Sequence, residues 1–507
     1  MLVHHFLENS AEKYPNKEAV WHKDLWTSFM DIEQNANRIA NFLIKNGISR
    51  GDRIGLLMEN SINYIISYFA ILKAGAVVVA INNEVTSDNL LFYLNNSESC
   101  AIIAGNRFSP LLPTLSQAHT VRFIISDTSL ADPPRIAYSL EDIFQTEKTQ
   151  RPEVSTISLD LASIVYTSGS TGKPKGVMLS HQNLSDNTIS ISKYLKLTPE
   201  DRIMVVLPLY YIYGSSLLTT HFYCGGSVAI DNRFMFPNLV IEAMKRVQAT
   251  GFAGVPSTYM ILLNKSSIRQ SKLESLRYVT QAGGSMPPQL QLQVAETFAP
   301  AKLYVMYGTT EAAPRLTYLE PEMLSLKLGS IGKAIPNVEV IIADEHGRAL
   351  PAGHIGEIAA RGSNIMPGYW KDPQSSSAVI RNGYYFTGDL GKTDEDGYIY
   401  IVGRTKDMIK VGGNRVSAKE VEEALLNLPH ISEAAVIGVP DSILGEAIKA
   451  FVVIKTGHTP DVSEIKKQLS SFISPYKVPS LYSFYKELPK NESGKVMKEK
   501  LRESSDN

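Results

Sequence analysis

The sequence predicts an α/β protein: a large N-terminal domain of layered α/β subdomains plus a β-rich region, followed by a small α+β C-terminal domain. Three observations support this. Strand and helix patterns alternate over residues 28–306, short strands separated by Gly and Pro dominate from residue 328, and a new mixture of helices and strands begins after Arg404. A chain of 507 residues with 44% hydrophobic side chains is long enough for about two to four domains.

The first α/β unit lies between residues 28 and 81. Apolar side chains recur at helical spacing over 28–46, so we expect a helix that begins at a serine cap and ends before Gly47. The short apolar runs 53–58 and 76–81 are typical of strands, and Asn60 is the expected cap of the helix between them. A strand, a helix and a strand at this spacing predict a parallel sheet.

Further elements follow the same patterns. We expect the α/β alternation to return at 203–206, 239–263, 276–281, 288–298 and 302–306. Later strands are expected at 338–343, 355–360, 397–402, 433–439 and 447–454, and later helices at 418–427 and 462–472. The segments after Arg404 together span about 100 residues, which is enough for a small domain. We therefore predict two domains, 1–405 and 406–507.

Charge and cysteine content narrow the class of protein. The formal net charge is −1, which gives no reason to expect nucleic acid as a partner. The two cysteines, Cys100 and Cys224, lie far apart and outside any metal-binding spacing, as is usual for buried thiols in a reducing compartment. The N-terminus lacks the features of a signal peptide, and no apolar run is long enough for an integral membrane segment. We therefore expect a cytoplasmic protein.

Residues 166–176 form a loop of unusual composition, Tyr-Thr-Ser-Gly-Ser-Thr-Gly-Lys-Pro-Lys-Gly. Such a loop exposes several backbone N–H groups at one concave spot, as loops that bind phosphate do, and Lys173 and Lys175 add positive charge. It is not a Walker A loop, because two residues instead of four separate Gly169 from Gly172 and a proline follows the lysine. The alternative is a flexible surface turn.

The position of this loop in the chain favours phosphate binding over a surface turn. An apolar strand at 163–166 leads into it, and a helical stretch starts at His181. Phosphate-binding loops commonly occupy such a place after a strand and before a helix. We expect Lys175 to make the more lasting contact with the phosphates, although the sequence does not separate it from Lys173.

Five segments in a fixed order carry a family resemblance. They are Tyr166–Val177 (YTSGSTGKPKGV), Tyr307–Glu311 (YGTTE), Tyr385–Leu390 (YFTGDL), Gly403–Asp407 (GRTKD) with Lys410–Gly413 (KVGG), and Pro489–Lys495 (PKNESGK). Together they resemble the signature of the adenylate-forming superfamily, which includes acyl-CoA synthetases, adenylation domains of peptide synthetases and luciferases. The resemblance implies a two-step reaction with ATP and Mg²⁺. A carboxylate attacks the α-phosphate to give an acyl-adenylate and pyrophosphate, and a thiol then displaces AMP.

The resemblance also implies a set of ATP-binding residues. These are Thr167, Ser168, Gly169, Ser170, Thr171, Gly172, Lys175, Gly284, Tyr307, Gly308, Thr309, Thr310, Asp389, Arg404 and Lys495. Tyr307 would stack on adenine, and Thr310 would bind the α-phosphate. Glu311 would hold Mg²⁺, which prefers hard oxygen ligands. Asp389 would accept the ribose hydroxyl groups, and Arg404 would contact ribose or phosphate.

The C-terminal motifs would serve the two steps in turn. Lys495 is the expected catalytic lysine of the first step, because a cation between the carboxylate and the α-phosphate offsets their repulsion. The resemblance implies a mobile C-terminal domain that rotates about Lys406 between the steps. Lys410, Gly412 and Gly413 would then line the thiol channel, where glycine permits close approach of the backbone.

The acid pocket is less well determined by the sequence. The matching segments place Tyr211, Ile212, Gly214, Gly254, Gly283 and Gly284 in its walls. Tyr211 stands where many acyl-CoA synthetases have histidine. Ile212 stands where domains for α-amino acids have aspartate, so an ammonium group would lack its partner there and such a substrate is disfavoured. The aromatic Tyr211 and Tyr213 suit an aryl acid or a small to medium acyl chain, while Phe222 is better explained as core.

Several functions share these motifs. The preferred hypothesis is a ligase that joins a small carboxylic acid to coenzyme A. The alternative is a stand-alone adenylation enzyme that loads an aryl, acyl or amino acid onto the phosphopantetheine of an acyl or peptidyl carrier protein. A catalytically inactive nucleotide-binding scaffold is disfavoured by intact Glu311, Asp389, Arg404 and Lys495. A luciferase-like oxygenase has the same motifs and is disfavoured only because such enzymes are rarer.

Overall fold

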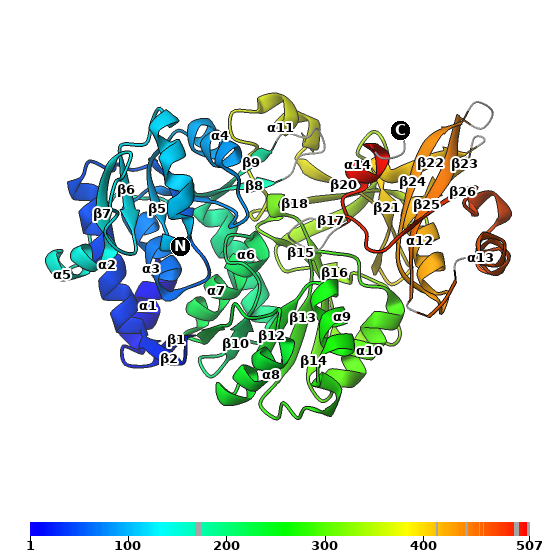
Figure 1. The fold of residues 1–507 in the computed structure, drawn as a ribbon, viewed down its shortest axis with the longest axis horizontal. Helices are drawn as coiled ribbons and strands as arrows, with labels where there is room; N and C mark the ends of the chain where they lie inside the picture. Colours follow the sequence, from blue (N-terminus) through cyan, green and yellow to red (C-terminus); the bar gives the residue numbers. More distant parts are fainter. Residues whose placement is uncertain are drawn as a thin grey trace.

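The described residues form four β-sheets that follow one another through the molecule (Figure 1). The structure is a computed structural model that describes residues 1–167, 174–411, 414–441, 445–455, 457–459, 461–490 and 496–503. Two large sheets with their helices make up the blue to green half of Figure 1, and two smaller sheets follow in yellow and orange. This arrangement confirms the predicted fold class.

The first large sheet has the strand order β7-β6-β5-β3-β4-β8-β9 and is parallel except for β9. Its strands are β3 (Arg53–Leu57), β4 (Val77–Ala80), β5 (Ser99–Ala104), β6 (Phe123–Ser126), β7 (Ile136–Ser139), β8 (Leu161–Thr167) and β9 (Lys175–Ser180). The helices of this region are α2 (Phe29–Lys45), α3 (Ile62–Lys73), α4 (Ser87–Ser97), η1 (Asn106–Gln117) and α5 (Leu140–Thr146). The parallel pairing of β3 with β4 across α3 confirms the predicted βαβ unit.

The second large sheet has the order β16-β15-β14-β13-β12-β10-β11-β1-β2. Its strands are β1 (Glu18–His22), β2 (Leu25–Ser28), β10 (Arg202–Val205), β11 (Ser227–Ile230), β12 (Gly251–Gly254), β13 (Tyr278–Gln281), β14 (Lys302–Gly308), β15 (Arg315–Leu319) and β16 (Lys333–Ala334). Its helices are α1 (His5–Lys13), α6 (His181–Leu195), α7 (Ile212–Cys224), α8 (Pro237–Arg246), α9 (Pro256–Lys265), η2 (Ile268–Gln270), α10 (Pro288–Phe298), η3 (Thr310–Ala312) and η4 (Pro321–Met323). Strand β14 is paired in parallel with β13 and antiparallel with β15.

A single apolar core joins the two large sheets. Ile54 and Ile103 of the first sheet and Ile203 of the second belong to one cluster with Phe69 and Phe222, all nearly inaccessible to water. The outer faces carry separate cores, with α8, α9 and α10 on the second sheet and α4 with η1 on the first. Burial of this apolar surface is the main stabilisation of the layered arrangement. Phe222 is a core residue, as the sequence suggested.

The cap of helix α3 (Ile62–Lys73) lies one residue later than predicted. The hydroxyl of Ser61 accepts a hydrogen bond from the backbone of Tyr64 and caps the helix, so the prediction of Asn60 as the cap was wrong. The Asn60 side chain instead donates to the Leu207 carbonyl and accepts from the Leu209 backbone, both at 2.8 Å. It therefore ties α3 to the segment that precedes α7.

The glycine loop lies inside a hairpin. The sequence analysis placed it between a strand and a helix, but strand β9 (Lys175–Ser180) stands between the loop and α6. Strands β8 and β9 are antiparallel, and Thr167 pairs with Lys175 at the end of the hairpin. Residues 168–173 lie outside the described residues.

The third and fourth sheets are smaller. The third contains β17 (Val338–Ala343), β18 (Gly356–Gly362), β19 (Ile380–Arg381), β20 (Tyr384–Thr393) and β21 (Ile399–Arg404), with α11 (Pro373–Val379) before β19. The fourth contains β22 (Met408–Val411), β23 (Asn414–Ser417), β24 (Ile431–Asp441), β25 (Gly445–Ile454) and β26 (Leu481–Tyr485). Its helices are α12 (Ala418–Leu426), α13 (Val462–Leu469), η6 (Pro475–Lys477) and α14 (Lys498–Glu503). All predicted later strands and helices are present, with ends shifted by a few residues.

The single turn η5 (Thr405–Asp407) connects the third sheet to the fourth. Across this connection, the Lys419 ammonium group donates to the Ile401 carbonyl at 2.9 Å, and the Ser417 hydroxyl donates to the Val402 carbonyl. The division into domains 1–405 and 406–507 stays a prediction.

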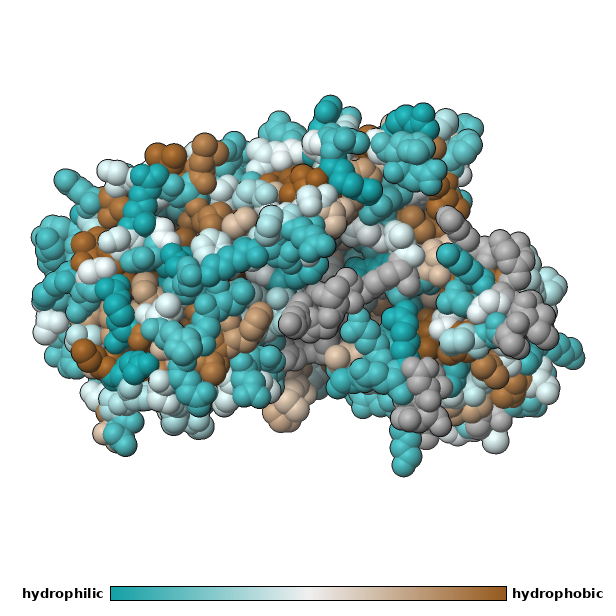
Figure 2. Space-filling model, turned by 90° about the horizontal axis from the view of Figure 1, so that it is seen from above, coloured by the Kyte–Doolittle hydropathy of each residue, from teal (hydrophilic) through white to brown (hydrophobic). Residues whose placement is uncertain are grey.

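The surface is mixed in character. Figure 2 shows hydrophilic and hydrophobic residues interspersed over one face of the molecule. Within the part of the chain that the structure describes, every helix is too short or too polar to cross a bilayer.

Candidate active site

Three of the predicted residues meet at a buried carboxylate. Asp389 on β20 is 5% exposed, and its Oδ2 accepts a hydrogen bond from the Tyr307 hydroxyl at 2.6 Å. Its Oδ1 accepts from Nε of Arg404, on the neighbouring strand β21, at 2.9 Å. The Asp389 backbone N–H donates to the Thr387 hydroxyl at 3.1 Å. The cluster therefore holds one negative charge between a phenol and a guanidinium group.

The electrostatics of this cluster follow from burial and pairing. Burial, and then the neighbouring Asp389, raises the pKa of Tyr307 well above its ordinary value, so the phenol remains a donor at neutral pH. The carboxylate of Asp389 raises the pKa of Arg404, whose side chain is half exposed. The buried carboxylate is therefore paired with a guanidinium group that reaches solvent.

A second group gathers around Tyr369. Its hydroxyl donates to Oε1 of Glu311, in η3, at 2.9 Å, and its ring lies 5.2 Å from the Lys175 ammonium group. Lys175 also donates to the Ser375 hydroxyl at 2.8 Å. Burial, and then Glu311, raises the pKa of Tyr369. The predicted magnesium ligand and the predicted phosphate-binding lysine thus both contact Tyr369.

Glu311 fits the requirements of a magnesium ligand. It is half-buried, and within the described residues no lysine or arginine nitrogen lies within ion-pair distance of its carboxylate. A carboxylate without a protein cation leaves its charge available to Mg²⁺, which binds oxygen ligands together with phosphates. Glu311 is therefore the residue that would hold the ion.

The short segment between Tyr307 and Glu311 connects the two groups. Thr309 donates to the Tyr385 hydroxyl at 3.3 Å, and Thr310 begins the single turn η3. Gly308 ends β14, where a side chain would clash, because a Cβ atom would lie 1.8 Å from the Pro314 carbonyl oxygen. Glycine here keeps β14 and the strand after it in contact.

The predicted pocket residues surround the start of α7 and the ends of β12 and β13. Tyr211 is half-buried and in ring contact with Tyr210, and Ile212 is buried. Gly214 lies in the first turn of α7, where a Cβ atom would be 2.0 Å from the Pro208 carbonyl oxygen, so this glycine has a packing reason of its own. Gly254 ends β12, and the Gly284 carbonyl accepts from the Gln281 side chain at 2.7 Å. Gly283 has a positive φ of +81°.

A small cavity lies beside these segments. Its walls come from α6, α7, β13, β14 and β15, and they consist of Ile191, Leu195, Tyr213, Ser216, Leu217, Thr220, His221, Tyr278, Thr280, Met306 and Arg315. None of the six predicted pocket residues lines it, although Tyr213 and Thr280 are near neighbours of Ile212 and Gly283 in the chain. Met286 and Tyr259, close to Gly284 and Gly254 in the chain, belong to the outer core of the second sheet.

The structure describes only some of the site residues predicted after Arg404. Lys406 lies in η5, the connection between the third and fourth sheets. Lys410 is exposed on β22, and its backbone N–H donates to the Glu446 carboxylate at 2.6 Å. Gly412, Gly413 and Lys495 lie outside the described residues, as do Ser168, Gly169, Ser170, Thr171 and Gly172 of the glycine loop.

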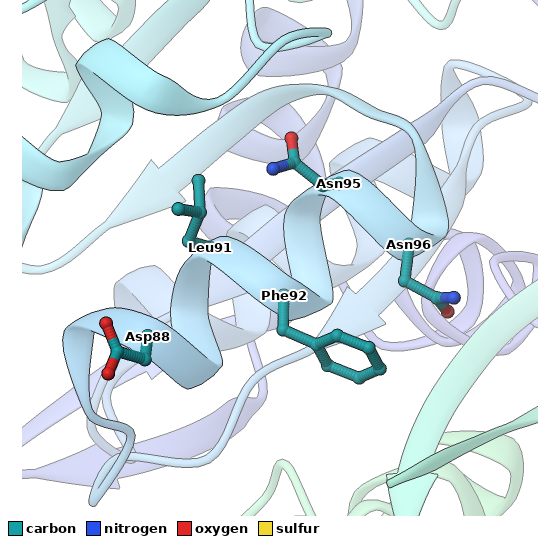
Figure 3. Close-up of a pocket in the computed structure, with 5 residues that line it drawn as sticks. All are labelled: Asp88, Leu91, Phe92, Asn95 and Asn96. Atoms are coloured by element: carbon teal, nitrogen blue, oxygen red, sulfur yellow. The ribbon is translucent and has the colours of Figure 1, made fainter. Parts of the chain in front are cut away.

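Two other features of the N-terminal half bring polar side chains together. A hollow on the outer side of α4 is formed by Asp88, Leu91, Phe92, Asn95 and Asn96 (Figure 3). All five residues belong to α4, and none of them is a predicted site residue; within the described ranges no other element lines the hollow.

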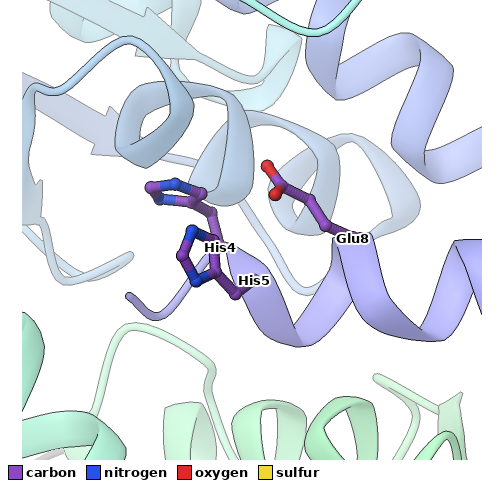
Figure 4. A group of neighbouring side chains, drawn as sticks. All are labelled: His4, His5 and Glu8. Atoms are coloured by element: carbon purple, nitrogen blue, oxygen red, sulfur yellow. The ribbon is translucent and has the colours of Figure 1, made fainter. Parts of the chain in front are cut away.

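A cluster of His4, His5 and Glu8 brings three possible metal ligands together at the N-terminus (Figure 4). The Glu8 carboxylate already lies 2.5 Å from the ammonium nitrogen of Lys73, which competes with a metal ion for its charge. The cluster is therefore better explained as part of an ion-pair network in the core.

Two residues near the predicted site were not found from the sequence. Tyr369 contacts both Glu311 and Lys175, and Arg315 lines the cavity although it is charged and buried. The signal for Arg315 was present, since a cation stands four residues after Glu311 at the start of an apolar strand. No sequence pattern indicated Tyr369, because its partners lie far away in the chain.

The family of AMP-binding enzymes matches residues 7–370, and the C-terminal domain of AMP-binding enzymes matches residues 420–495. The long-chain-fatty-acid–CoA ligase of Bacillus subtilis (strain 168) is 34% identical, over 98% of this chain and 93% of that enzyme. Solved structures are also similar. That of the anthranilate CoA ligase AuaEII with anthranoyl-AMP has a TM-score of 0.92 at 27% identity, over 100% of this chain and 97% of that one. That of ATP-bound MatB from Rhodopseudomonas palustris has a TM-score of 0.90 at 29% identity, over 100% and 99%. With its sequence motifs and its fold in agreement, this chain belongs to the family of AMP-binding enzymes.

Proposed function

We propose that this protein activates a small carboxylic acid with ATP, releases pyrophosphate, and transfers the acyl group from the acyl-adenylate to coenzyme A. The observation that carries the proposal is the buried Asp389 carboxylate between Tyr307 and Arg404, with Glu311 four residues after Tyr307. The similar fatty-acid–CoA ligase and the similar structure with anthranoyl-AMP support this reaction class. Transfer to a carrier protein is the less supported alternative.

Asp389 and its partners would bind the nucleoside. Its buried carboxylate accepts hydrogen bonds on both oxygens, so it is held in one orientation and its charge is available to the ribose hydroxyl groups. Arg404 would contact ribose or phosphate through the part of its guanidinium group that reaches solvent. Tyr307 would present its ring to adenine while its hydroxyl stays bonded to Asp389.

The phosphates would lie between Thr310, Glu311 and Lys175. Glu311 would hold Mg²⁺, which neutralises phosphate charge when bound. Lys175 is oriented by Ser375 and by the ring of Tyr369, whose hydroxyl also donates to Glu311. Cations and hydroxyl donors fixed in advance around the phosphates lower the free energy of the transition state, where negative charge increases.

Lys495 and the C-terminal domain would complete the two steps. In the first step the Lys495 cation would lie between the attacking carboxylate and the α-phosphate. A rotation about Lys406 would then bring Lys410, Gly412 and Gly413 to the thiol channel. The connection η5 is short, which suits a hinge that changes the direction of a domain without releasing it. The expectation of a cytoplasmic enzyme stays a prediction.

The proposal is tested by pyrophosphate release with ATP and Mg²⁺ and without any thiol, across fatty, aryl, dicarboxylic and amino acids. We expect release with one class of acid, followed by thioester formation when coenzyme A is added. A carrier protein that accepts the acyl group while coenzyme A does not would replace the acceptor in the proposal. An absence of acid-dependent release with every class would contradict adenylation itself.

Lys495→Ala provides the mechanistic test. We expect it to reduce adenylation by roughly two to three orders of magnitude, as loss of one fixed electrostatic group commonly does, while thioester formation from supplied acyl-adenylate continues. Lys490→Ala is the matched control, because Lys490 lies in the same motif but is ion-paired with Glu433 at 2.6 Å. Equal loss in both half-reactions would contradict the role assigned to Lys495.

A further inference from the structure

Arg315 is a buried cation that has no carboxylate partner among the described residues. It is 2% exposed at the start of β15, and among the described lysines and arginines only it and Lys73 are classed as buried. Lys73 lies 2.5 Å from Glu8 and 2.9 Å from Glu33. In contrast, no carboxylate of the described residues lies within 4.0 Å of the Arg315 guanidinium group, and its Nε has no hydrogen-bond partner.

The neighbours of Arg315 are neutral. Its guanidinium carbon lies 5.1 Å from the ring centroid of Tyr213, and the hydroxyl of the nearby Tyr194 donates to the Met306 sulfur at 3.0 Å. Burial raises the pKa of Tyr213 to about 12 and also raises that of Tyr194, so neither phenol supplies a negative charge. Burial lowers the pKa of His221 to about 4, so this ring is uncharged as well. An isolated buried charge is unfavourable unless a partner neutralises it.

Arg315 faces the cavity described above. The other polar groups of its lining are the hydroxyls of Tyr213, Ser216, Thr220, Tyr278 and Thr280 and the ring of His221. The Ser216 and Thr220 hydroxyls donate to backbone carbonyls of α7, and the remaining four groups pair with one another, Tyr213 with Thr280 and Tyr278 with His221. About 10 Å³ of the cavity is open to the centre of a water molecule, which is roughly the room of one water. The cavity therefore sets the Arg315 cation, whose Nε has no partner, among neutral polar groups, and it has little space for a long apolar chain.

The cavity adjoins the predicted adenylation residues. Met306 lines it, and the next residue of β14 is Tyr307, which contacts Asp389. Successive side chains of a strand point to opposite faces, so one strand serves both the cavity and the nucleoside residues. Arg315 pairs with Gly308 across β14 and β15, and Glu311 stands four residues before it.

We propose that the acid substrate is a short-chain acid with a second carboxylate, and that Arg315 binds this second carboxylate in the cavity while the first is adenylated. This inference rests on the proposed function and specifies the substrate of the same site. A guanidinium group binds a carboxylate through two parallel hydrogen bonds, which gives orientation as well as affinity. The relatives compared above include enzymes named for a fatty acid and for anthranilate, so the second carboxylate would distinguish this protein from them.

Matched pairs of acids test the proposal. Malonate, succinate and glutarate are compared with propionate, butyrate and valerate in the pyrophosphate-release assay. We expect kcat/KM for the best diacid to exceed that for its monoacid by about tenfold or more, because a hydrogen bond to a charged group has that effect on affinity. A monoacid that is used as well as its diacid at every chain length would overturn the inference.

Substitution of Arg315 extends the test. Arg315→Met should remove the preference for diacids and leave or increase activity with the monoacid, whereas Arg315→Lys keeps the cation and should retain part of the preference. The matched control is Arg361→Met, since Arg361 is an exposed arginine ion-paired with Glu339. A preference for diacids that persists in Arg315→Met would also overturn the inference.

Thermal unfolding separates this inference from the proposed function. A diacid should raise the Tm of the wild-type protein and of Arg361→Met but not that of Arg315→Met, and this readout needs no turnover. Without ligand, Arg315→Met should unfold at the same or a higher temperature, because an unpaired buried charge has been removed. If acids are adenylated but no diacid shifts the Tm through Arg315, the inference fails and the proposed function stands. If diacids shift the Tm through Arg315 but no acid is adenylated, the proposed function fails and only the binding of a diacid at Arg315 stands.

Discussion

Asp389 illustrates how much one residue of the site depends on its surroundings. Its charge is stabilised by Arg404 and by the Tyr307 phenol, and its burial keeps water from weakening both contacts. The two partners come from different sheets, since Tyr307 lies near the end of β14 in the second large sheet and Arg404 is the last residue of β21 in the third. A single carboxylate thus joins two sheets at the place where the nucleoside is expected.

Asp389→Asn should weaken ATP binding strongly. The amide removes the charge that Arg404 and the ribose hydroxyls require, and the loss of hydrogen bonds to a charged group costs about 1.5–3 kcal/mol, or roughly 10- to 150-fold in Kd. Titration calorimetry with ATP or AMP measures this directly. Asp394→Asn is the control, because Asp394 follows the same strand but pairs with Lys327 at 2.8 Å. Equal ATP affinity in Asp389→Asn and the wild type would remove Asp389 from the binding site.

The site residues that belong to sequence motifs could be predicted, whereas those that join the site only through tertiary contacts could not. Tyr307, Asp389 and Arg404 were placed in one site from sequence alone, and the structure brings them into contact. Tyr369 contacts Glu311, 58 residues away in the chain, and nothing local indicates such a pairing. Arg315 is visible in the sequence, but its lack of a carboxylate partner is a property of the fold.

Among the elements, α1, α2 and α3 are joined by a buried ion network. Lys73, in the last turn of α3, contacts Glu8 of α1 and Glu33 of α2, and Arg151 contacts both carboxylates from the segment before β8. His4 and His5 border the network at the start of α1 (Figure 4). Each charge of the network has a neighbour of opposite sign, which offsets the cost of its burial. Removal of one member would leave an unpaired buried charge.

Lys73→Met should destabilise the protein by about 3–5 kcal/mol, because it leaves Glu8 and Glu33 with the single cation of Arg151. Lys45→Met is the matched control at the end of the neighbouring helix α2. Lys45 is exposed and paired with Glu147, so its loss should change stability by less than about 1 kcal/mol. Denaturant titration compares the two variants. Equal small effects would show that the buried network contributes little.

Element types were easier to predict than element ends. The helical period over 28–46 produced α2, capped by Ser28 as expected, because periodicity and cap agree in that segment. Asn60 and Ser61 are adjacent candidate caps before α3. The Asn60 side chain is hydrogen-bonded to Leu207 and Leu209 instead, so Ser61 caps the helix. Strand β9 was missed because the sequence analysis continued from the loop directly to the helix at His181.

At the scale of the whole molecule, buried histidines lie in the large N-terminal part. Burial lowers the pKa of His4 to about 2 and those of His181 and His221 to about 4. His4 and His181 are in edge-to-face contact, and His181 Nδ1 accepts from the Val3 backbone at 3.1 Å, so the N-terminus is fastened to α6. His221 is bonded to Leu217 and Tyr278 inside the same core. All three rings are neutral in the folded protein at neutral pH.

The N-terminal part should therefore lose stability as the pH falls from 6.5 toward 4. In this range the histidines of the unfolded chain, whose ordinary pKa is near 6.5, bind protons, whereas the three buried histidines of the folded protein stay neutral. The free energy of unfolding therefore increases as the pH rises and decreases on acidification. Each histidine contributes up to about 1.4 kcal/mol per pH unit. Denaturant titrations at pH 7.5, 6.5 and 5.5 measure the slope, and His181→Gln should reduce it by up to one third. His346→Gln removes an exposed ring and should leave it unchanged. An identical slope in wild type and His181→Gln would mean that His181 accepts its proton without unfolding, and that the contact between the N-terminus and α6 opens independently of the core.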